Sequence, residues 1–554
     1  MSSVRLSVFL MAAAGLACGE SITQPTVASV SIAPDSTTIS VTETATFTAS
    51  VLDASGLPVE SVTLIWTSGD PTVFSVEGGV VTAIAPGSAL LLANAGGLRD
   101  EARVVVTPGP ASSLAIQPSA TVLDPGATRK FKVEIEDAFG NDVSDAAIEW
   151  STSNAAVITV DADSARITGV APGTAWVRAA VGQVADSAQV DVVPFALNAI
   201  DAGAQFSCGV SNGYSVYCWG GNAFGVLGNG TTDGTSNAPQ AVLGEVEFTG
   251  VSTGGTHVCG LERGGAVACW GRNHRGQLGD NTTATRSRPV FIRSDFSFKG
   301  VSVGDTHGCA ITTGGIPYCW GGNDFAQTGQ PLGASFPGAP PNVVPIPLRV
   351  ESTPSFIGMS TGANHNCGLT TTGLAYCWGD GQAGQIGDGN TQGHVEPVPV
   401  AGGISFTTVS AGLTYNCALN AVGAAYCWGT GGAGQLGTGT SLELTPAAVN
   451  SGLVFTTITG GGTHTCGLTA TGDAYCWGAG TFGQLGDGLS ANSPTPVQVA
   501  GGLTFQRIRA SHGGSHTCAL TTGGVAYCWG RNDQGQLGDG TNGDAALPVR
   551  VSGQ

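Results

Sequence analysis

Charged residues are scarce in this chain, and positive charge is scarcest. Charged residues make up 11% of the 554 positions, with 20 Lys and Arg against 39 Asp and Glu and a formal net charge of −19. An acidic surface repels a phosphate backbone, so we expect no nucleic-acid partner. No stretch has the roughly 18 consecutive apolar residues of a membrane-spanning helix, so we also expect no transmembrane helix.

Two motifs of catalysis are missing. The sequence contains no His-Glu-x-x-His helix and no phosphate-binding loop. A pair of carboxylates for glycoside cleavage is defined by its separation in space, so a carbohydrate-active enzyme stays open as an alternative. We expect a protein that is not an enzyme and that needs no cofactor.

The N-terminus has the features of an export signal. Arg5 precedes an apolar run and small residues lead to Cys18, so residues 1–17 are predicted to be a signal peptide. The sequence "AGLAC" resembles the lipobox of bacterial lipoproteins, although Gly15 stands where Leu is commoner. This resemblance implies lipidation of Cys18 and a place in the bacterial cell envelope, at the outer membrane or cell surface. An ordinary signal peptide and a secreted protein are the alternative.

Two segments, residues 26–108 and 111–194, alternate apolar and polar residues between turns. Stretches such as "ATFTASVLDASG" and "KFKVEIEDAFG" have the period of two and the turn spacing of a β-sandwich. Trp66 and "APG" at 85–87 in the first segment correspond to Trp150 and "APG" at 171–173 in the second. The segments resemble the group 2 bacterial immunoglobulin (Ig)-like domain, which implies two sandwiches acting as stalk modules. Neither segment contains cysteine, so packing alone must hold each one together.

Fourteen of the 15 cysteines fall into seven pairs whose members are ten residues apart. The pairs are Cys208/Cys218, Cys259/Cys269, Cys309/Cys319, Cys367/Cys377, Cys417/Cys427, Cys466/Cys476 and Cys518/Cys528. A tight turn at Thr521–Gly524 would place Cys518 opposite Cys528 on antiparallel strands, with Cα atoms about 4.5–5.5 Å apart. Paired thiolates of structural zinc sites are usually about two to four residues apart. We therefore predict seven disulfides rather than metal sites or free thiols.

These pairs belong to a repeat that fills residues 195–554. Successive first cysteines are 51, 50, 58, 50, 49 and 52 residues apart, a period typical of β-propeller blades. The pattern "HTCALTTGG-AYCWG-N--GQLGDG" resembles the regulator of chromosome condensation repeat. The resemblance implies a seven-bladed propeller. The fold class is therefore predicted as all-β: two Ig-like sandwiches and then a seven-bladed propeller.

The histidines and aspartates of the repeat are predicted to be structural. The residue two places before the first cysteine is His257, His307, His365, His464 or His516 in five copies, but Phe206 and Tyr415 in the others. A metal-binding or catalytic histidine would not tolerate that exchange, whereas a packed side chain would. Asp280, Asp388, Asp487 and Asp539 lack the ligand spacing of a calcium loop and are expected to bond their own turns.

The largest departure from the repeat is an insert at residues 331–347, "PLGASFPGAPPNVVPIP". Its prolines argue against a central strand, and Phe336 is expected on a rim loop. The loop from Pro331 through Phe336 to Pro347 is a candidate binding loop, and a tolerated surface insertion is the alternative. We expect a monomeric lipoprotein that touches the membrane only through its anchor and binds an unidentified protein or glycan. Secreted inhibition of a hydrolase is the alternative, while guanine-nucleotide exchange fits an exported acidic chain poorly.

Overall fold

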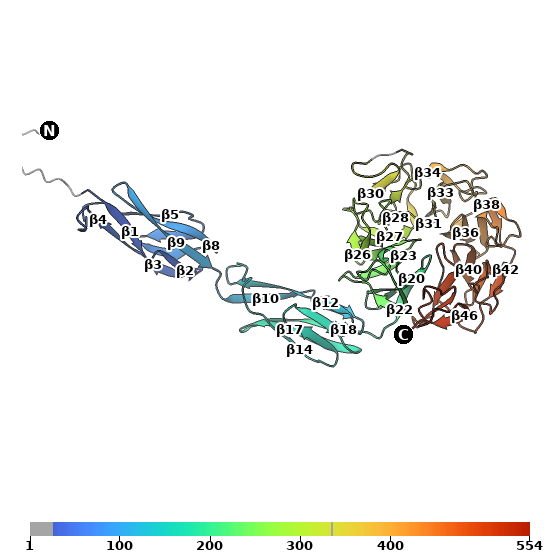
Figure 1. Cartoon of the computed structure of the whole chain (residues 1–554), viewed down its shortest axis with the longest axis horizontal. Coiled ribbons are helices and arrows are strands. Elements are labelled where there is room, and N and C mark those ends of the chain that lie inside the picture. The colour runs from blue at the N-terminus through green and yellow to red at the C-terminus, as the bar shows by residue number, and fades with distance from the viewer. Residues whose placement is uncertain (1–25, 334–335) are drawn as a thin grey trace, which may run out of the picture. The chain divides into compact units, whose positions relative to one another are not determined.

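The computed structural model describes residues 26–333 and 336–554 (Figure 1). The predicted signal peptide and Cys18, the predicted lipid acceptor, lie outside these residues. Within them, no helix is long and apolar enough to cross a membrane. Their regular structure is almost entirely β, with one short 3-10 helix, η1 (Ala223–Gly225).

The first segment folds as a sandwich with three sheets, ordered β2-β9-β8-β5, β3-β7-β6 and β1-β4. Alternation places every second side chain inside: along β9, Ala102, Val104 and Val106 are buried and their neighbours are more exposed. Phe47 and Phe74 fill the core between the sheets. Its strands are β1 (Ser29–Ala33), β2 (Ser36–Ser40), β3 (Thr44–Thr46), β4 (Thr48–Leu52), β5 (Ile65–Ser68), β6 (Phe74–Glu77), β7 (Val80–Ala83), β8 (Gly87–Ala95) and β9 (Leu98–Thr107).

The second segment repeats this topology strand for strand. Its sheets are ordered β11-β18-β17-β14, β12-β16-β15 and β10-β13. In both segments one strand pair of the largest sheet is parallel, β2 with β9 and β11 with β18. Its strands are β10 (Ala111–Gln117), β11 (Ala120–Leu123), β12 (Thr128–Lys130), β13 (Lys132–Asp137), β14 (Glu149–Thr152), β15 (Ile158–Asp161), β16 (Arg166–Gly169), β17 (Gly173–Val181) and β18 (Val184–Val192).

The repeats form seven sheets of four antiparallel strands, each ordered as in the chain (Figure 1). Blades 1 to 3 consist of β19 (Leu197–Ala202), β20 (Phe206–Ser211), β21 (Val216–Gly221) and β22 (Thr235–Ala241); β23 (Phe248–Thr253), β24 (His257–Glu262), β25 (Val267–Gly271) and β26 (Arg286–Phe291); and β27 (Phe298–Val303), β28 (His307–Thr312), β29 (Pro317–Gly322) and β30 (Val343–Arg349). Every strand of a blade therefore comes from the same repeat, so the all-β fold with seven blades is confirmed.

Blades 4 to 7 follow the same plan. Their strands are β31 (Phe356–Thr361), β32 (His365–Thr370), β33 (Ala375–Gly379) and β34 (His394–Pro399); β35 (Phe406–Ala411), β36 (Tyr415–Asn420), β37 (Ala425–Thr430) and β38 (Leu442–Ala448); β39 (Thr457–Gly460), β40 (His464–Leu468), β41 (Ala474–Gly478) and β42 (Ser493–Gln498); and β43 (Arg507–Ala510), β44 (His516–Leu520), β45 (Ala526–Gly530) and β46 (Ala545–Arg550).

A disulfide joins the second and third strands of every blade, and all seven predicted pairings are formed. In blade 7, Leu520 lies opposite Ala526 beside the bridge, which is the predicted register. From blade 1 to blade 7 the bridges are Cys208–Cys218, Cys259–Cys269, Cys309–Cys319, Cys367–Cys377, Cys417–Cys427, Cys466–Cys476 and Cys518–Cys528.

The separation of the bridged residues differs from the predicted one. The two Cα atoms of each disulfide are 4.1 Å apart, closer than the expected range. Facing residues that do not exchange backbone hydrogen bonds are about 4.5 Å apart, and those that do are about 5.5 Å apart. The expected range covered pairs with and without exchanged backbone hydrogen bonds. The observed Cα separation is nearest to that of pairs that do not exchange them.

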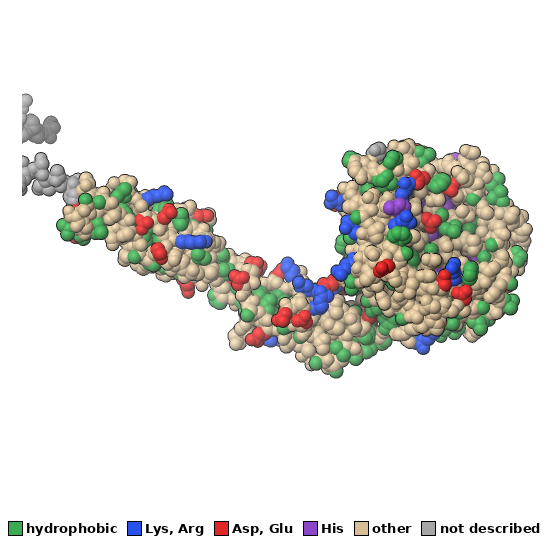
Figure 2. Space-filling model, in the orientation of Figure 1, with side chains coloured by type: hydrophobic (Ala, Val, Ile, Leu, Met, Phe, Trp, Pro, Cys, Tyr) green, Lys and Arg blue, Asp and Glu red, His purple; other side chains and the backbone are tan. Residues whose placement is uncertain are grey.

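Each blade packs one face against the tryptophan of the following blade. The Cys518–Cys528 face of blade 7 lies against Trp219 of blade 1, and the Cys259–Cys269 face of blade 2 lies against Trp320 of blade 3. The tryptophans of the seven blades are fully buried. Because both faces of a blade are covered in this way, both can be apolar. The surface of the propeller in view shows mostly uncharged side chains and backbone, with charged groups scattered (Figure 2).

Candidate functional site

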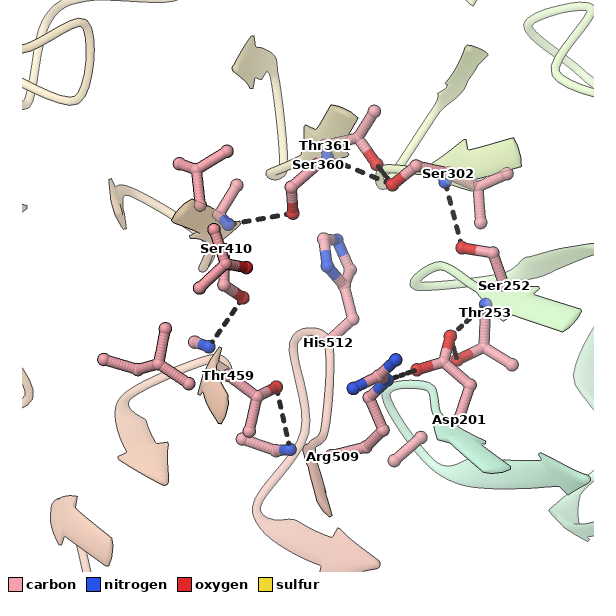
Figure 3. A pocket seen from close by; sticks show the side chains of 18 of the residues that line it. Asp201, Ser252, Thr253, Ser302, Ser360, Thr361, Ser410, Thr459, Arg509 and His512 are labelled. Carbon is pink, nitrogen blue, oxygen red and sulfur yellow. Dashed lines mark hydrogen bonds and ion pairs between the residues drawn. The ribbon is translucent and has the colours of Figure 1, made fainter. Parts of the chain in front are cut away.

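A cavity of about 420 Å³ lies at the centre of the propeller. Its walls come from the first strand of every blade: β19, β23, β27, β31, β35, β39 and β43 (Figure 3). The first strand lies at one edge of each four-stranded sheet, and because it lines the cavity it is the innermost strand of its blade. Side chains from seven different repeats therefore converge on one polar space, which we call the central channel.

One position of each inner strand forms a ring around the channel. The residue lies opposite the first cysteine of its own blade, and the ring consists of Asp201, Ser252, Ser302, Ser360, Ser410, Thr459 and Arg509. Six of these side chains accept a hydrogen bond from a backbone N–H of the next blade, as Ser410 Oγ does from Gly460 at 2.9 Å. The other donors are Thr253, Val303, Thr361, Ala411 and Ala510. The ring thus ties each blade to its neighbour.

Arg509 breaks this pattern at the junction between blade 7 and blade 1. A guanidinium has no acceptor atom, and its Nε lies 3.5 Å from Asp201 Oδ1 across the junction (Figure 3). Burial raises the pKa of Asp201, while Arg509 and the hydrogen bonds from Thr253 oppose that rise. An ion pair therefore stands where the other junctions have a hydroxyl or carboxylate that accepts a backbone N–H.

Blade 7 also has two extra residues between its ring position and its second strand. The other six blades begin the second strand five residues after the ring position, as Thr459 and His464 show, whereas seven residues separate Arg509 from His516. The longer segment projects His512 into the channel, where its side chain is nearly buried (Figure 3). His512 Nε2 lies 3.3 Å from Asp305 Oδ1. Burial raises the pKa of Asp305, but its bond to His512 and nearby histidines lower it, with a net shift downward.

The five repeated histidines lie between blades rather than in the channel. His307 and His365 bond Asn366 and Asn416 of the next blade, at 2.9 and 3.1 Å from Nε2 to Oδ1. His464 and His516 bond Thr517 and Ser207 in the same way. Desolvation lowers the pKa of all five, to about 3 for His257 and His516 and about 4 for the others. These contacts agree with the structural role predicted for them.

The two exceptions to histidine also fit this contact. The hydroxyl of Tyr415 lies 2.9 Å from Thr465 Oγ1 of blade 6. Phe206 packs in one apolar cluster with Val258, the residue that takes the place of Thr465 in blade 2. In each blade, the residue two places before the first cysteine therefore suits the residue of the next blade that it contacts. The exception is His257, which faces Gly308, a residue without a side chain.

The bridged cysteines lie outside the channel, in the packing between blades. All fourteen are buried, and the described residues that line the channel include no cysteine. Their sulfur atoms are joined in pairs and are not available as thiolate ligands or nucleophiles. They are Cys208, Cys218, Cys259, Cys269, Cys309, Cys319, Cys367, Cys377, Cys417, Cys427, Cys466, Cys476, Cys518 and Cys528.

The aspartates of the glycine-rich turns bond their own turns, as expected. The residue two positions later donates its backbone N–H to each carboxylate, from Thr282 to Asp280, Asn390 to Asp388, Leu489 to Asp487 and Thr541 to Asp539. Within the described residues no cluster of His, Cys, Asp and Glu has the arrangement of a metal site.

The candidate loop at 331–347 is less exposed than expected. Pro331 is exposed, but Phe336 is half-buried, and Pro347 is buried within β30. Residues 343–347 of the insert belong to β30, which is an outermost and not a central strand, and Phe336 lies outside any strand. The prolines are accommodated because β30 pairs only with β29, and an outermost strand leaves N–H positions unpaired.

The residues that make the channel distinctive were not identified from the sequence. Asp201, Arg509 and His512 are unremarkable by themselves, because their importance depends on which strand is innermost. One signal was present: "FTTVSAGLTY" (406–415) of blade 5 corresponds to "FQRIRASHGGSH" (505–516) of blade 7, with two arginines and a longer connection.

Protein-family models match parts of the repeat region and the second sandwich. The family model of the regulator of chromosome condensation (RCC1) repeat matches residues 215–261, 264–311, 372–419, 423–468 and 471–520. A second RCC1 repeat model matches residues 248–277, 298–327, 356–385, 455–484 and 510–536. The bacterial Ig-like domain (group 2) model matches residues 110–192, which is the second sandwich.

Similar proteins share only part of this chain. The human probable E3 ubiquitin-protein ligase HERC4 is 40% identical over 85 residues, 15% of this chain and 8% of HERC4. The chain therefore spans under a tenth of that protein. Human WBSCR16 has a TM-score of 0.55 at 22% identity, over 61% of this chain and 94% of its own. Prp20p of Saccharomyces cerevisiae has a TM-score of 0.53 at 20% identity, over 65% of this chain and 88% of its own. At these identities the two structures share the fold alone.

Proposed function

Because this chain contains RCC1 repeats together with a group 2 bacterial Ig-like domain, we propose that it is an exported binding protein. Its propeller recognises a protein or glycan partner and catalyses no reaction. Fold alone does not assign this role, since one fold hosts many functions. The proposal rests on how the shared and the unshared residues of the repeat are used.

The observation that carries the proposal is that the shared residues are already occupied. The cysteines, the tryptophans and the histidines of the repeat are buried in contacts within or between blades. Recognition is therefore left to residues that differ between repeats. In the channel these are Asp201, Arg507, Arg509 and His512.

The disulfides support export. Seven disulfides form and persist in an oxidising compartment and are rare in the cytosol. In this proposal Cys18 is lipidated and anchors the protein in a bacterial cell envelope. The sandwiches serve as modules between anchor and propeller.

The composition of the channel wall favours binding over glycoside cleavage. Among the described residues that line the cavity, Asp201 is the single carboxylate, and Arg509 pairs with it. Glycoside hydrolysis normally uses two carboxylates that flank the scissile bond. The wall supplies hydrogen-bond donors instead.

The test uses the purified full-length chain with its disulfides intact. It is incubated with a glycan array and with intact bacterial surfaces, and bound material is competed with excess free protein. Saturable, competed capture without turnover of any bound polysaccharide would support the proposal. Turnover of a polysaccharide would overturn it, and capture of a hydrolase with loss of that enzyme's activity would replace it with inhibition.

Two variants locate the contact on the propeller. Arg507→Gln changes the channel, and Phe336→Ala changes the loop of blade 3. We expect capture to fall with the first and to persist with the second, because Phe336 is already half-buried. If capture were lost with Phe336→Ala and kept with Arg507→Gln, the partner would bind the loop of blade 3 and not the channel.

A further inference from the structure

The inner strand of blade 7 places two arginines where the other blades have smaller side chains. Arg507 and Arg509 lie opposite Leu520 and Cys518, which fixes their positions in the repeat. The residues equivalent to Arg507 are Ala199, Gly250, Gly300, Gly358, Thr408 and Thr457. The sevenfold pattern is therefore broken twice on one strand, and both times by a guanidinium.

The two arginines differ in their partners. Arg509 pairs with Asp201 and also donates from Nη1 to its own strand at Ile508 O, 3.1 Å away. Arg507 is exposed, lines the channel and has no acceptor within residues 26–333 and 336–554. One positive charge in the channel is thus balanced and the other is not, in a chain of net charge −19.

Hydroxyl groups extend this donor surface beyond blade 7. Ser360 Oγ and Ser410 Oγ each accept a backbone N–H, so the proton of each hydroxyl remains available to donate. Thr408 and Thr457 also line the channel. Oxyanions are the ligands that such a set of guanidinium and hydroxyl donors binds best.

We propose that the central channel binds the oxyanion group, a carboxylate or a phosphate, of a small ligand between Arg507, Arg509 and the hydroxyls of β31, β35 and β39. The cavity of about 420 Å³ is within the size range of small-molecule sites. This inference rests on the proposed binding function and names the chemistry of its ligand. The oxyanion belongs either to a free small acid or to an acidic sugar residue of a glycan.

Calorimetric titration of the full-length oxidised chain tests the proposal. The probes are inorganic phosphate, glucuronate and a short oligogalacturonate, and neutral glucose is the control. We expect binding of at least one acidic probe, weakened by added salt, and none of glucose. Tighter binding of the oligogalacturonate than of both monomeric acids assigns the site to a glycan, and equal or weaker binding assigns it to a free acid.

Three variants make the test specific. Arg507→Gln should weaken binding about tenfold or more, because it removes a charge-assisted contact without touching the Asp201 pair. The double variant Asp201→Ser, Arg509→Ser copies the ring residue of blades 2 to 5 and should also weaken binding while the melting temperature shows that the propeller is folded. Arg99→Gln, an exposed change in the first sandwich, should leave binding unchanged.

Unchanged affinity in Arg507→Gln, equal binding of glucose, or no binding of any acidic probe would overturn the inference. Failure of the wider proposal looks different. If partner capture is absent while the acidic probe binds and requires Arg507, the channel site stands without the binding function proposed above.

Discussion

His516 Nε2 lies 2.9 Å from Ser207 Oγ, and this contact joins the last blade to the first. Ser207 also donates to Gln536 O at 3.0 Å. All four strands of blade 7 come from the last repeat, and all four strands of blade 1 come from the first. The ring is therefore closed by contacts between side chains and loops, not by a strand shared between the two ends of the repeat.

The contact between blade 7 and blade 1 can be weakened by removing one hydroxyl, that of Ser207. Ser207→Ala should lower the free energy of unfolding by about 1–3 kcal/mol, because the buried His516 and the carbonyl of Gln536 both lose a partner. Thr517→Ala is the matched control, since Thr517 makes the same two contacts, to His464 and Gln484, inside the ring. Urea denaturation measures the free energy of unfolding of both variants. An unchanged midpoint for Ser207→Ala would show that closure does not depend on this contact.

The buried histidines should make the propeller sensitive to acid. Burial lowers their pKa from 6.5 to about 3 or 4, so the folded state binds protons less readily than the unfolded state. Their contribution to stability is complete above about pH 6.5 and is lost as the pH falls toward 4. On going from pH 7 to pH 5, each of these histidines should lower the free energy of unfolding by about 2 kcal/mol.

A pair of phenylalanine variants tests whether the buried histidines cause the acid sensitivity. His257→Phe copies Phe206 of blade 1, and His257 has no side-chain partner within the described residues. We expect this variant to be as stable as the parent at pH 7 and about 2 kcal/mol more stable than it at pH 5. His307→Phe is the control and should lose about 1–3 kcal/mol at pH 7, because it leaves the Oδ1 atom of the buried Asn366 without its histidine partner. Equal acid sensitivity in parent and His257→Phe would contradict the explanation.

The close contact between blades is also testable at a glycine. A Cβ at Gly538 would lie 2.6 Å from Trp219 Nε1, while a Cβ at Gly501 would meet nothing within 4 Å. Both glycines have positive φ, 71° and 99°, so an alanine is strained at either position. Gly538→Ala should therefore lose about 1–3 kcal/mol more than Gly501→Ala in thermal unfolding. Equal losses would mean that Trp219 can move aside.

The fold was predictable because its signals are local and repeated. A constant spacing of ten residues fixes the cysteine register in every blade, and the turn carboxylates of Asp280 and Asp539 bond residues two positions away. Repetition then specifies the propeller. Each of these inferences needs only a short stretch of chain and its copies.

The site was not predictable because its contacts join residues that are far apart in the sequence and are not repeated. The partner of His516 is 309 residues away, and Arg509 meets Asp201 only after the ring closes. Phe336 lies outside any strand, as expected, but it is half-buried. Loop length and composition do not determine how far a side chain on a loop is buried.

The last prediction concerns the disulfides. Each one closes a loop of about eleven residues and should contribute about 3 kcal/mol by restricting the unfolded chain. Replacing both Cys518 and Cys528 by Ala should lower the free energy of unfolding by about that amount. It should leave the fold intact, because Leu520, Ala526 and Trp219 keep the same apolar cluster together. Intact-mass measurement after alkylation of native protein should find the fourteen propeller cysteines unreactive until a reductant is added. Fourteen alkylated thiols before reduction would show that packing between the blades, without the bridges, is enough to hold the propeller together.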